Sequence, residues 1–288
     1  MPPQSLWEFD AIGAPWRIDT PDELSESQRF AVADRIEAFD RDWSRFRADS
    51  VVSRISRAPG HHRLPADAGP LMEWYRELYD ATGGRVSPLV GRTLESLGYD
   101  ASYRLTPVAE RVAVPAWADA MAWDGEYLDT ARPVLLDVGA AGKGYLVDLI
   151  SDLLVELRVI THVVDASGDL RVRGDAVERI ALEHPADPSK AIGVLELREG
   201  ALCASASNRR SWGDGLHHVI DAVTGVPTAS VVATWAVAPD ALHADGLATA
   251  LFFDPDPNLF ASGNVYYVRM FANGRVEHSP SFPGELFT

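Results

Sequence analysis

The chain has 288 residues, of which 47% are hydrophobic, and its formal net charge is −16 at pH 7. This length and apolar content are enough for a substantial core, which excludes general disorder. The excess of acid argues against nucleic acid as the main partner, because binding phosphate backbones needs a continuous surface rich in Lys and Arg. One cysteine, Cys203, excludes an internal disulfide framework and fits a reducing compartment.

The N-terminal sequence MPPQSLWEFDAIGAPWRID shows no basic stretch followed by an apolar run, and no cysteine that could accept a lipid. Apolar runs elsewhere are far too short to span a membrane. We therefore expect a cytoplasmic protein without membrane insertion.

Two helices are predicted in the first part of the chain. Residues 22–47 place apolar side chains at helical spacing between charged ones: Phe30, Ala33, Ile36, Phe39, Trp43 and Phe46. Residues 71–82 form the second predicted helix, which is followed by a glycine pair suited to a C-terminal cap.

Short β-branched segments bounded by turn residues predict strands farther along the chain. These cover residues 132–138, 161–167, 170–175, 191–198, 201–206, 216–221, 231–238 and 265–271. Two helices interrupt them, at residues 145–157 and 241–252. Strands in consecutive runs with isolated helices predict an α+β fold, with a mostly antiparallel sheet and flanking helices. Since no linker divides the sequence, we expect one domain over residues 1–288.

The stretch LLDVGAAGKGYLVD, residues 135–148, is a glycine-rich turn between a predicted strand and a predicted helix. It matches neither the P-loop pattern nor the dinucleotide fingerprint. Its small residues still allow a close backbone approach, Lys143 supplies a cation, and the helix N-terminus favours an anion. A phosphate site and a tight turn with a surface lysine both fit this stretch.

The stretch APDALHADGLATALFF, residues 238–253, places Asp240 at a helix N-cap position. Asp245 and Thr249 follow four residues apart, so a carboxylate and a hydroxyl project from one face of an otherwise apolar helix. A carboxylate in such a setting needs a partner, and Mg²⁺ prefers oxygen ligands. A surface Asp beside a Thr bonded to its own backbone is the alternative.

The stretch LHHVIDAVTGVP, residues 216–227, carries two adjacent histidines, His217 and His218. Successive strand residues face opposite sides, so only one of the two can point into a given site. An imidazole with its ordinary pKa of about 6.5 suits proton transfer near neutral pH, although a structural histidine is the alternative.

Two more polar stretches have ordinary explanations beside functional ones. Ser167, Gly168 and Asp169 form a turn between strands, which a simple hairpin explains. The segment CASASNRRSW offers Ser205, Ser207 and Arg210, which also fit a polar strand end.

Taken in order, these stretches resemble the ApbE-type family, the FAD:protein FMN transferases. LLDVGAAGKGYLVD is similar to the family's Asp-x-Gly…Lys-Gly-Tyr…Asp element, and DASGDLRVRG to its Gly-Gly-Asp turn. HHVIDAVTGVP resembles its His-Ile-Ile-Asp-Pro-x-Thr-Gly-x-Pro element, and APDALHADGLATALF its Ala-Asp-Ala-Leu-Ala-Thr-Ala helix. Upstream, DWSRFRADSVVSRI is similar to its Ser-Thr-Tyr-Arg-x-Asp-Ser segment, so the resemblance covers about residues 11–253.

The resemblance implies a bound FAD whose pyrophosphate is bridged to the protein by Mg²⁺. The metal ligands would be the Asp245 carboxylate, the Thr249 hydroxyl and the backbone carbonyl of Ala140. The catalytic residues would be Asp245, Lys143 at the phosphates, and His218 as the group that takes a proton from the attacking hydroxyl. The flavin nucleotide would lie against Phe46, Val86, Ser87, Pro88, Leu89, Asp137, Lys143 and Val219.

The implied reaction cleaves FAD, releases AMP and joins FMN through a phosphoester bond to a Thr or Ser of an acceptor flavoprotein. Hydrolysis of FAD to FMN and AMP, and FAD binding without turnover, are the alternatives. The chain departs from the family pattern in CASASN, which has Ala204-Ser205-Ala206-Ser207 where the family has Thr-Ser-Gly-Asp. It also has Ala222 in place of the proline after Asp221.

Overall fold

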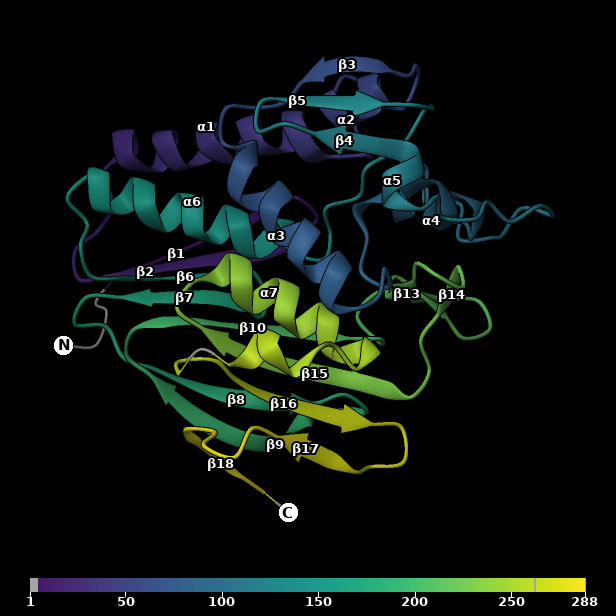
Figure 1. Cartoon of the computed structure of the whole chain (residues 1–288). Coiled ribbons are helices and arrows are strands. Elements are labelled where there is room, and N and C mark those ends of the chain that lie inside the picture. The colour runs from purple at the N-terminus through teal and green to yellow at the C-terminus, as the bar shows by residue number, and fades with distance from the viewer. Residues whose placement is uncertain (1–4, 262, 288) are drawn as a thin grey trace.

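The computed structural model describes residues 5–261 and 263–287, and its central feature is an eight-stranded sheet (Figure 1). Neighbouring strands of this sheet pair antiparallel throughout, which confirms the predicted α+β class. The strand order across the sheet is β1 (Ser5–Ala11), β2 (Ala14–Thr20), β6 (His162–Asp165), β7 (Asp169–Arg173), β10 (Gly200–Ala206), β15 (Val231–Ala238), β16 (Tyr266–Phe271) and β17 (Val276–His278).

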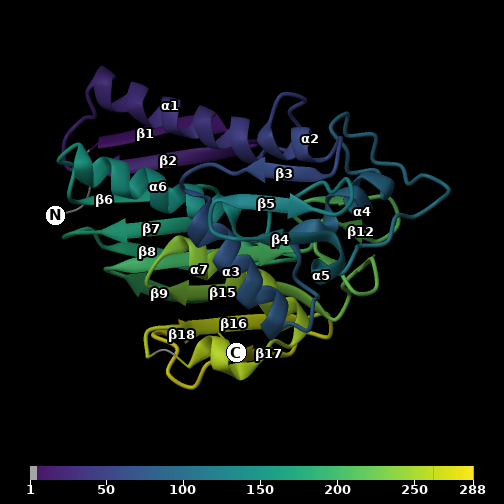
Figure 2. The ribbon, with the colours of Figure 1, turned by 45° about the horizontal axis from the view of Figure 1, so that its top comes forward.

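Helices cover one face of this sheet (Figure 2), and the larger hydrophobic core lies between the two layers. They are α1 (Glu26–Trp43), α3 (Ala68–Ala81), α6 (Gly142–Glu156) and α7 (Ala241–Ala250). The four predicted long helices are confirmed, with shifted ends. Helix α1 begins at Glu26 because Ser25 and Gln28 form a capping box, in which each side chain bonds the other residue's backbone N–H.

A three-stranded sheet, β8 (Glu178–His184), β9 (Asp187–Leu197) and β18 (Gly284–Leu286), forms the third layer with a second core. The central sheet is therefore buried on both faces. Strand β15 shows this directly, because Trp235 packs in the second core and Ala236 in the first. Burial on both faces explains why VVATWAVA is apolar almost throughout and does not alternate.

The remaining elements are short. They are α2 (Val51–Ile55), β3 (Gly60–Arg63), η1 (Pro88–Val90), α4 (Gly91–Ser96), α5 (Trp117–Ala120), β4 (Met121–Trp123), β5 (Tyr127–Thr130), β11 (Ser211–Trp212), β12 (Leu216–His217), β13 (Ile220–Asp221), β14 (Val226–Pro227), η2 (Leu251–Phe253) and η3 (Pro257–Phe260). Within residues 5–261 and 263–287, each helix is too short or too polar to cross a membrane.

Two strand predictions are wrong. Residues 132–138 are partly buried but form no strand, because their backbone meets η1, where the Asp137 N–H donates to the Pro88 carbonyl (2.8 Å). Residues 216–221 do not form one strand. They divide into β12 and β13, which belong to separate two-stranded hairpins.

Helices α6 and α7 cross in close contact at Gly144. A Cβ atom there would lie 2.1 Å from the Ala241 carbonyl oxygen and 2.6 Å from the Asp245 Cβ, so only glycine fits. The contact lets each helix cap the other. Asp245 of α7 accepts from the Gly144 N–H (2.9 Å), while Asp148 of α6 accepts from the first N–H groups of α7, at Ala241 (3.0 Å) and Leu242 (2.7 Å).

Gly144→Ala is expected to separate the two helices and to lower the free energy of unfolding by about 1–3 kcal/mol, as overpacking does. Gly69→Ala is the matched control, because its added Cβ would meet nothing nearer than the Trp123 ring at 3.9 Å. That variant should be neutral or stabilised, since alanine favours a helix. Urea unfolding of both variants provides the measurement, and equal stabilities would contradict the packing constraint.

Candidate active site

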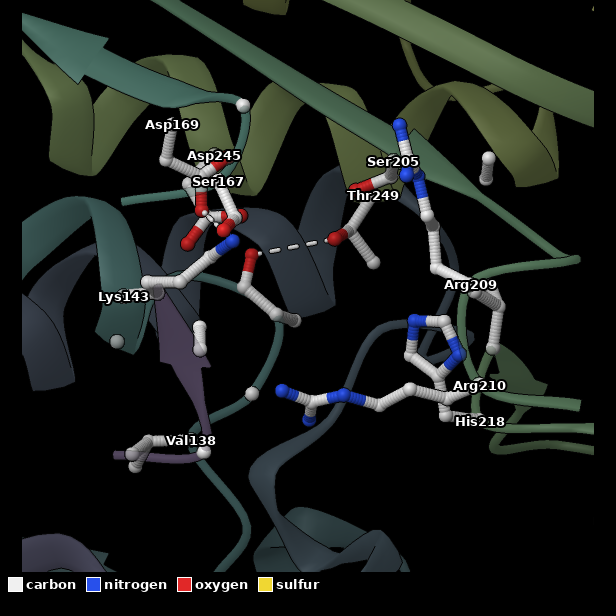
Figure 3. A pocket seen from close by; sticks show the side chains of 18 of the residues that line it. Val138, Lys143, Ser167, Asp169, Ser205, Arg209, Arg210, His218, Asp245 and Thr249 are labelled. Carbon is white, nitrogen blue, oxygen red and sulfur yellow. Dashed lines mark hydrogen bonds and ion pairs between the residues drawn. The ribbon is translucent and has the colours of Figure 1, made fainter. Parts of the chain in front are cut away.

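A cavity of about 1240 Å³ opens beside the N-terminus of α6 (Figure 3). Its walls come from the 137–143 turn, the β6–β7 turn, the end of β10, residues 218–220 and α7. Most of the residues singled out from the sequence line it: Phe46, Val86, Ser87, Asp137, Ala140, Lys143, His218, Val219, Asp245 and Thr249.

Asp245 is a buried carboxylate at the base of the cavity, 3% exposed. Burial, together with the neighbouring Asp169, raises the pKa of Asp245 well above its usual value. One turn along α7, the Thr249 hydroxyl donates to the Ala140 carbonyl (3.2 Å). The three groups predicted as metal ligands therefore belong to two segments that the structure brings together at the cavity.

Lys143 is bound to the β6–β7 turn. Its ammonium group lies 3.0 Å from the Asp169 carboxylate and donates to the Ala166 carbonyl (2.8 Å). Burial opposes its charge, but Asp169 and Asp245 outweigh this effect and hold the pKa of Lys143 above its usual value. Lys143 is thus a cation at neutral pH, set beside two buried acids.

Asp137 is held by the protein itself. One of its oxygens accepts from Arg45 Nε (2.5 Å), and the other accepts from the Gly139 N–H (2.8 Å). Burial alone would raise the pKa of Asp137, but Arg45 and the Gly139 N–H hold it below its usual value. The carboxylate lines the cavity and at the same time fixes the shape of the 137–140 turn.

The two histidines have different surroundings, although His218 lies in the bend after β12 and not within a strand. His217 is tied to its own loop, with Nε2 2.7 Å from the Thr228 carbonyl and Nδ1 accepting from the Val219 N–H (3.3 Å). His218 lines the cavity, and its buried Nδ1 has no hydrogen-bond partner among the described residues. Burial, followed by the charge of Arg210, lowers the pKa of His218 to about 4, so the ring is neutral at pH 7.

The segments expected to face the flavin are only partly in the cavity wall. Val86 and Ser87 line it, whereas Pro88 and Leu89 do not, because Pro88 turns its carbonyl to the Asp137 backbone and Leu89 is buried in the core. Phe46 lines the cavity, with its ring stacked on Tyr103 at 5.4 Å between centroids and Arg45 over it at 4.2 Å.

The donor atoms near Asp245 fit a hard cation. Among the described residues no group of three His, Cys, Asp or Glu side chains is arranged for a metal. A carboxylate, a hydroxyl and a carbonyl meet instead, and Asp169 Oδ1 is buried nearby with no hydrogen-bond partner in the same set of residues. Oxygen ligands of this kind suit Mg²⁺, which keeps few protein contacts and takes water and phosphate for the rest.

Comparison with known proteins decides the family. Residues 12–260 match the model of the ApbE family. The chain belongs to the ApbE family. The match covers every residue that lines the cavity, from Ile12 to Phe253.

Curated relatives carry the name FAD:protein FMN transferase. The protein of Haemophilus influenzae is 27% identical over 232 residues, which cover 73% of this chain and 67% of that protein. The protein of Rhodobacter capsulatus is 28% identical over 231 residues, which cover 73% of this chain and 43% of that protein. This ApbE-family chain thus spans about two thirds of the first relative and less than half of the second.

Solved structures agree in fold with this ApbE-family chain. The ApbE protein of Thermotoga maritima superposes with a TM-score of 0.84 at 22% identity, covering 96% of this chain and 97% of that one. The flavin transferase ApbE of Vibrio cholerae superposes with a TM-score of 0.80 at 20% identity, with the same coverage. The three-layer architecture is therefore shared with both.

Three charged residues of this ApbE-family site were not predicted from the sequence. Asp169 was interpreted as part of a turn similar to the family's Gly-Gly-Asp turn but was given no role, although an acid at the start of a buried strand was a usable signal. Arg45 lies 92 residues from Asp137, and no local pattern marks their pairing. Arg210 was considered as a cation or as part of a polar strand end and was given no role, and its side chain points into the cavity (Figure 3).

Asp137→Ala should destabilise the protein by about 3 kcal/mol, because it leaves the Arg45 guanidinium, 2% exposed, without its carboxylate. Glu126→Ala provides the comparison, since Glu126 pairs with Arg63 at the surface, where the two side chains are 55% and 71% exposed. Loss of that exposed pair should change the free energy of unfolding by no more than about 0.5 kcal/mol. Urea denaturation at pH 7 measures the free energy of unfolding of both variants. If Asp137→Ala loses as little stability as Glu126→Ala, the buried Arg45–Asp137 pair does not stabilise the fold.

Proposed function

We propose that this chain is a magnesium-dependent FAD:protein FMN transferase, which moves FMN from FAD to a Thr or Ser hydroxyl of an acceptor flavoprotein and releases AMP. The observation that carries the proposal is the meeting of three features in one cavity. They are the cation Lys143, the oxygen donors around Asp245, and the His218 Nδ1, which has no hydrogen-bond partner within the described residues. Membership of the ApbE family and the names of the curated relatives support it.

The phosphate half of the site would be formed by the α6 N-terminus and its surroundings. Lys143 stands in the first turn of α6, where the helix dipole favours anions, although the N–H groups of Gly142 and Gly144 are already bonded to Val138 and Asp245. Both neighbouring acids, Asp169 and Asp245, are buried, so water does not weaken their attraction for a cation. When bound by the Ala140 carbonyl, Asp245 and Thr249, Mg²⁺ would offset negative charge on the pyrophosphate oxygens.

The transfer step needs a proton acceptor beside the incoming hydroxyl. His218 has the required state, because a neutral ring with an unpartnered Nδ1 can take a proton. The acceptor oxygen forms a bond to the FMN phosphorus as the bond from that phosphorus to the bridging oxygen breaks. AMP leaves with the bridging oxygen, the hydroxyl proton moves to His218, and Lys143 stabilises charge on the phosphate oxygens.

The test is an AMP-release assay on the purified chain with FAD, Mg²⁺ and a panel of peptides containing Thr or Ser. We expect AMP and a flavin-labelled peptide in equal amounts, and His218→Ala should slow both by about 100-fold or more. AMP with free FMN in the absence of peptide would indicate hydrolysis. Tight FAD binding without AMP release would indicate a binding protein, and either result would overturn the transferase proposal.

The cytoplasmic location of the protein stays a prediction.

Asp245→Asn should separate folding from activity. The amide keeps an oxygen for the Gly144 N–H and removes a buried charge facing Asp169, so the melting temperature without Mg²⁺ should rise by about 2 °C or more. Stabilisation by Mg²⁺ with FAD should disappear, and AMP release should fall by about 100-fold or more. Asp254→Asn, at a side chain that is 82% exposed, should behave as wild type. Retained Mg²⁺-dependent turnover in Asp245→Asn would reject the metal assignment.

A further inference from the structure

The basic side chains around the cavity are mostly neutralised by the protein. Lys143 pairs with Asp169, Arg45 with Asp137, and Arg209 with Glu183 at 2.9 Å. Arg210 is different, because within residues 5–261 and 263–287 it takes part in no ion pair. In a chain with 42 acidic and 26 basic residues, a cation facing a cavity without a carboxylate is available for an anionic ligand.

A neutral partner fixes the direction of this side chain. Arg210 Nη1 donates to the Tyr99 hydroxyl (3.1 Å), and the Tyr99 ring is itself held by stacking on Trp212 at 5.4 Å between centroids. Burial raises the pKa of Tyr99, so the phenol is neutral at pH 7 and adds no negative charge beside the guanidinium. Asp137 and Asp245 act on Arg210 through space but form no ion pair with it within the described residues. The arginine is therefore oriented without being neutralised.

Arg210 is also tied to the histidine proposed as proton acceptor. The backbone N–H of His218 donates to the backbone carbonyl of Arg210 (3.2 Å), which holds the two residues side by side at the cavity wall. Figure 3 shows Arg210 entering the cavity from the side of His218 and Lys143 entering from the opposite side. The two cations thus face different parts of whatever anion lies between them.

We propose that Arg210 is a further catalytic residue, whose guanidinium binds the FMN phosphate of FAD and stays on that phosphate during transfer. This inference rests on the proposed function. The proton acceptor must lie next to the hydroxyl that attacks the FMN phosphorus, so a cation adjacent to His218 lies next to the same phosphate. A guanidinium suits this place because it can bind two phosphate oxygens at once.

The test compares ligands that differ by one phosphate. FMN and riboflavin, and separately AMP and adenosine, are titrated into wild type, Arg210→Gln and Arg209→Gln, with calorimetry as the readout. Arg210→Gln should weaken FMN binding by about 10- to 100-fold, the range for a charge-assisted contact, and leave the affinities for riboflavin and AMP unchanged. Arg209→Gln is the matched control, because the neighbouring side chain is 61% exposed and paired with Glu183, and it should bind all four ligands as wild type does.

A second readout is the pH dependence of AMP release. The charged or titratable groups that act on His218 are Arg210, His217 and Asp137. Removing the Arg210 charge raises the pKa of His218, so the low-pH limb of the rate profile should move to higher pH in Arg210→Gln. Arg210→Lys keeps the charge and should keep the wild-type pH profile of AMP release. Its affinity for FMN should lie between those of wild type and Arg210→Gln.

Several outcomes would overturn the assignment. Equal losses of affinity for FMN and riboflavin in Arg210→Gln would make Arg210 a structural residue. A loss of affinity for AMP in place of FMN would assign the side chain to the AMP phosphate. Unchanged FMN affinity in a folded Arg210→Gln would reject the contact altogether. Failure of the proposed function is distinguishable, because wild type would then release no AMP while the FMN and riboflavin comparison still reports on Arg210.

Discussion

The close crossing of α6 and α7 at Gly144 is the constraint on which the rest of the site depends. Without a side chain at this position, the backbone of α6 approaches the first turns of α7 closely enough for a carboxylate from each helix to reach the N-terminus of the other. The same approach sets Asp245 against the 140–143 turn. Lys143 and Ala140 line the cavity from that turn, so this part of the cavity wall follows from one backbone contact.

The two reciprocal caps differ in how well the protein compensates their carboxylates, although burial raises the pKa of both. Asp148 is compensated by Arg171 in addition to two backbone N–H groups, which suits a purely structural carboxylate. Asp245 receives one N–H and faces another acid, Asp169. A buried carboxylate with so little compensation costs stability, and on the proposed function a cation would supply the missing compensation. The cap made by Asp148 therefore serves stability, whereas the cap made by Asp245 leaves a buried carboxylate in the cavity wall.

The sequence predicted the parts whose causes are local. Helical periodicity gave the four long helices, and β-branched runs gave most strands of the central sheet. Local patterns failed where the partner lies far away: residues 132–138 are as apolar as a strand, but they meet a 3₁₀ turn and no sheet edge. The pairing of Arg45 with Asp137, and the burial of Asp169 beside Lys143, arise only after distant segments fold together. Cavity residues that stand in a recognisable motif, such as Lys143 and Asp245, were predicted. The contacts that depend on distant segments, such as the pairing of Arg45 with Asp137, were not.

The adjacent histidines divide two requirements that a single ring would find hard to meet. Holding an imidazole still usually takes hydrogen bonds, and these occupy the nitrogen atoms on which its reactivity depends. Here His217 makes the hydrogen bonds, to Thr228 and Val219, and so immobilises the backbone on which His218 follows. His218 receives its position through the chain and keeps Nδ1 unoccupied. Rigidity and chemical availability thus reside in two neighbouring residues of the same type.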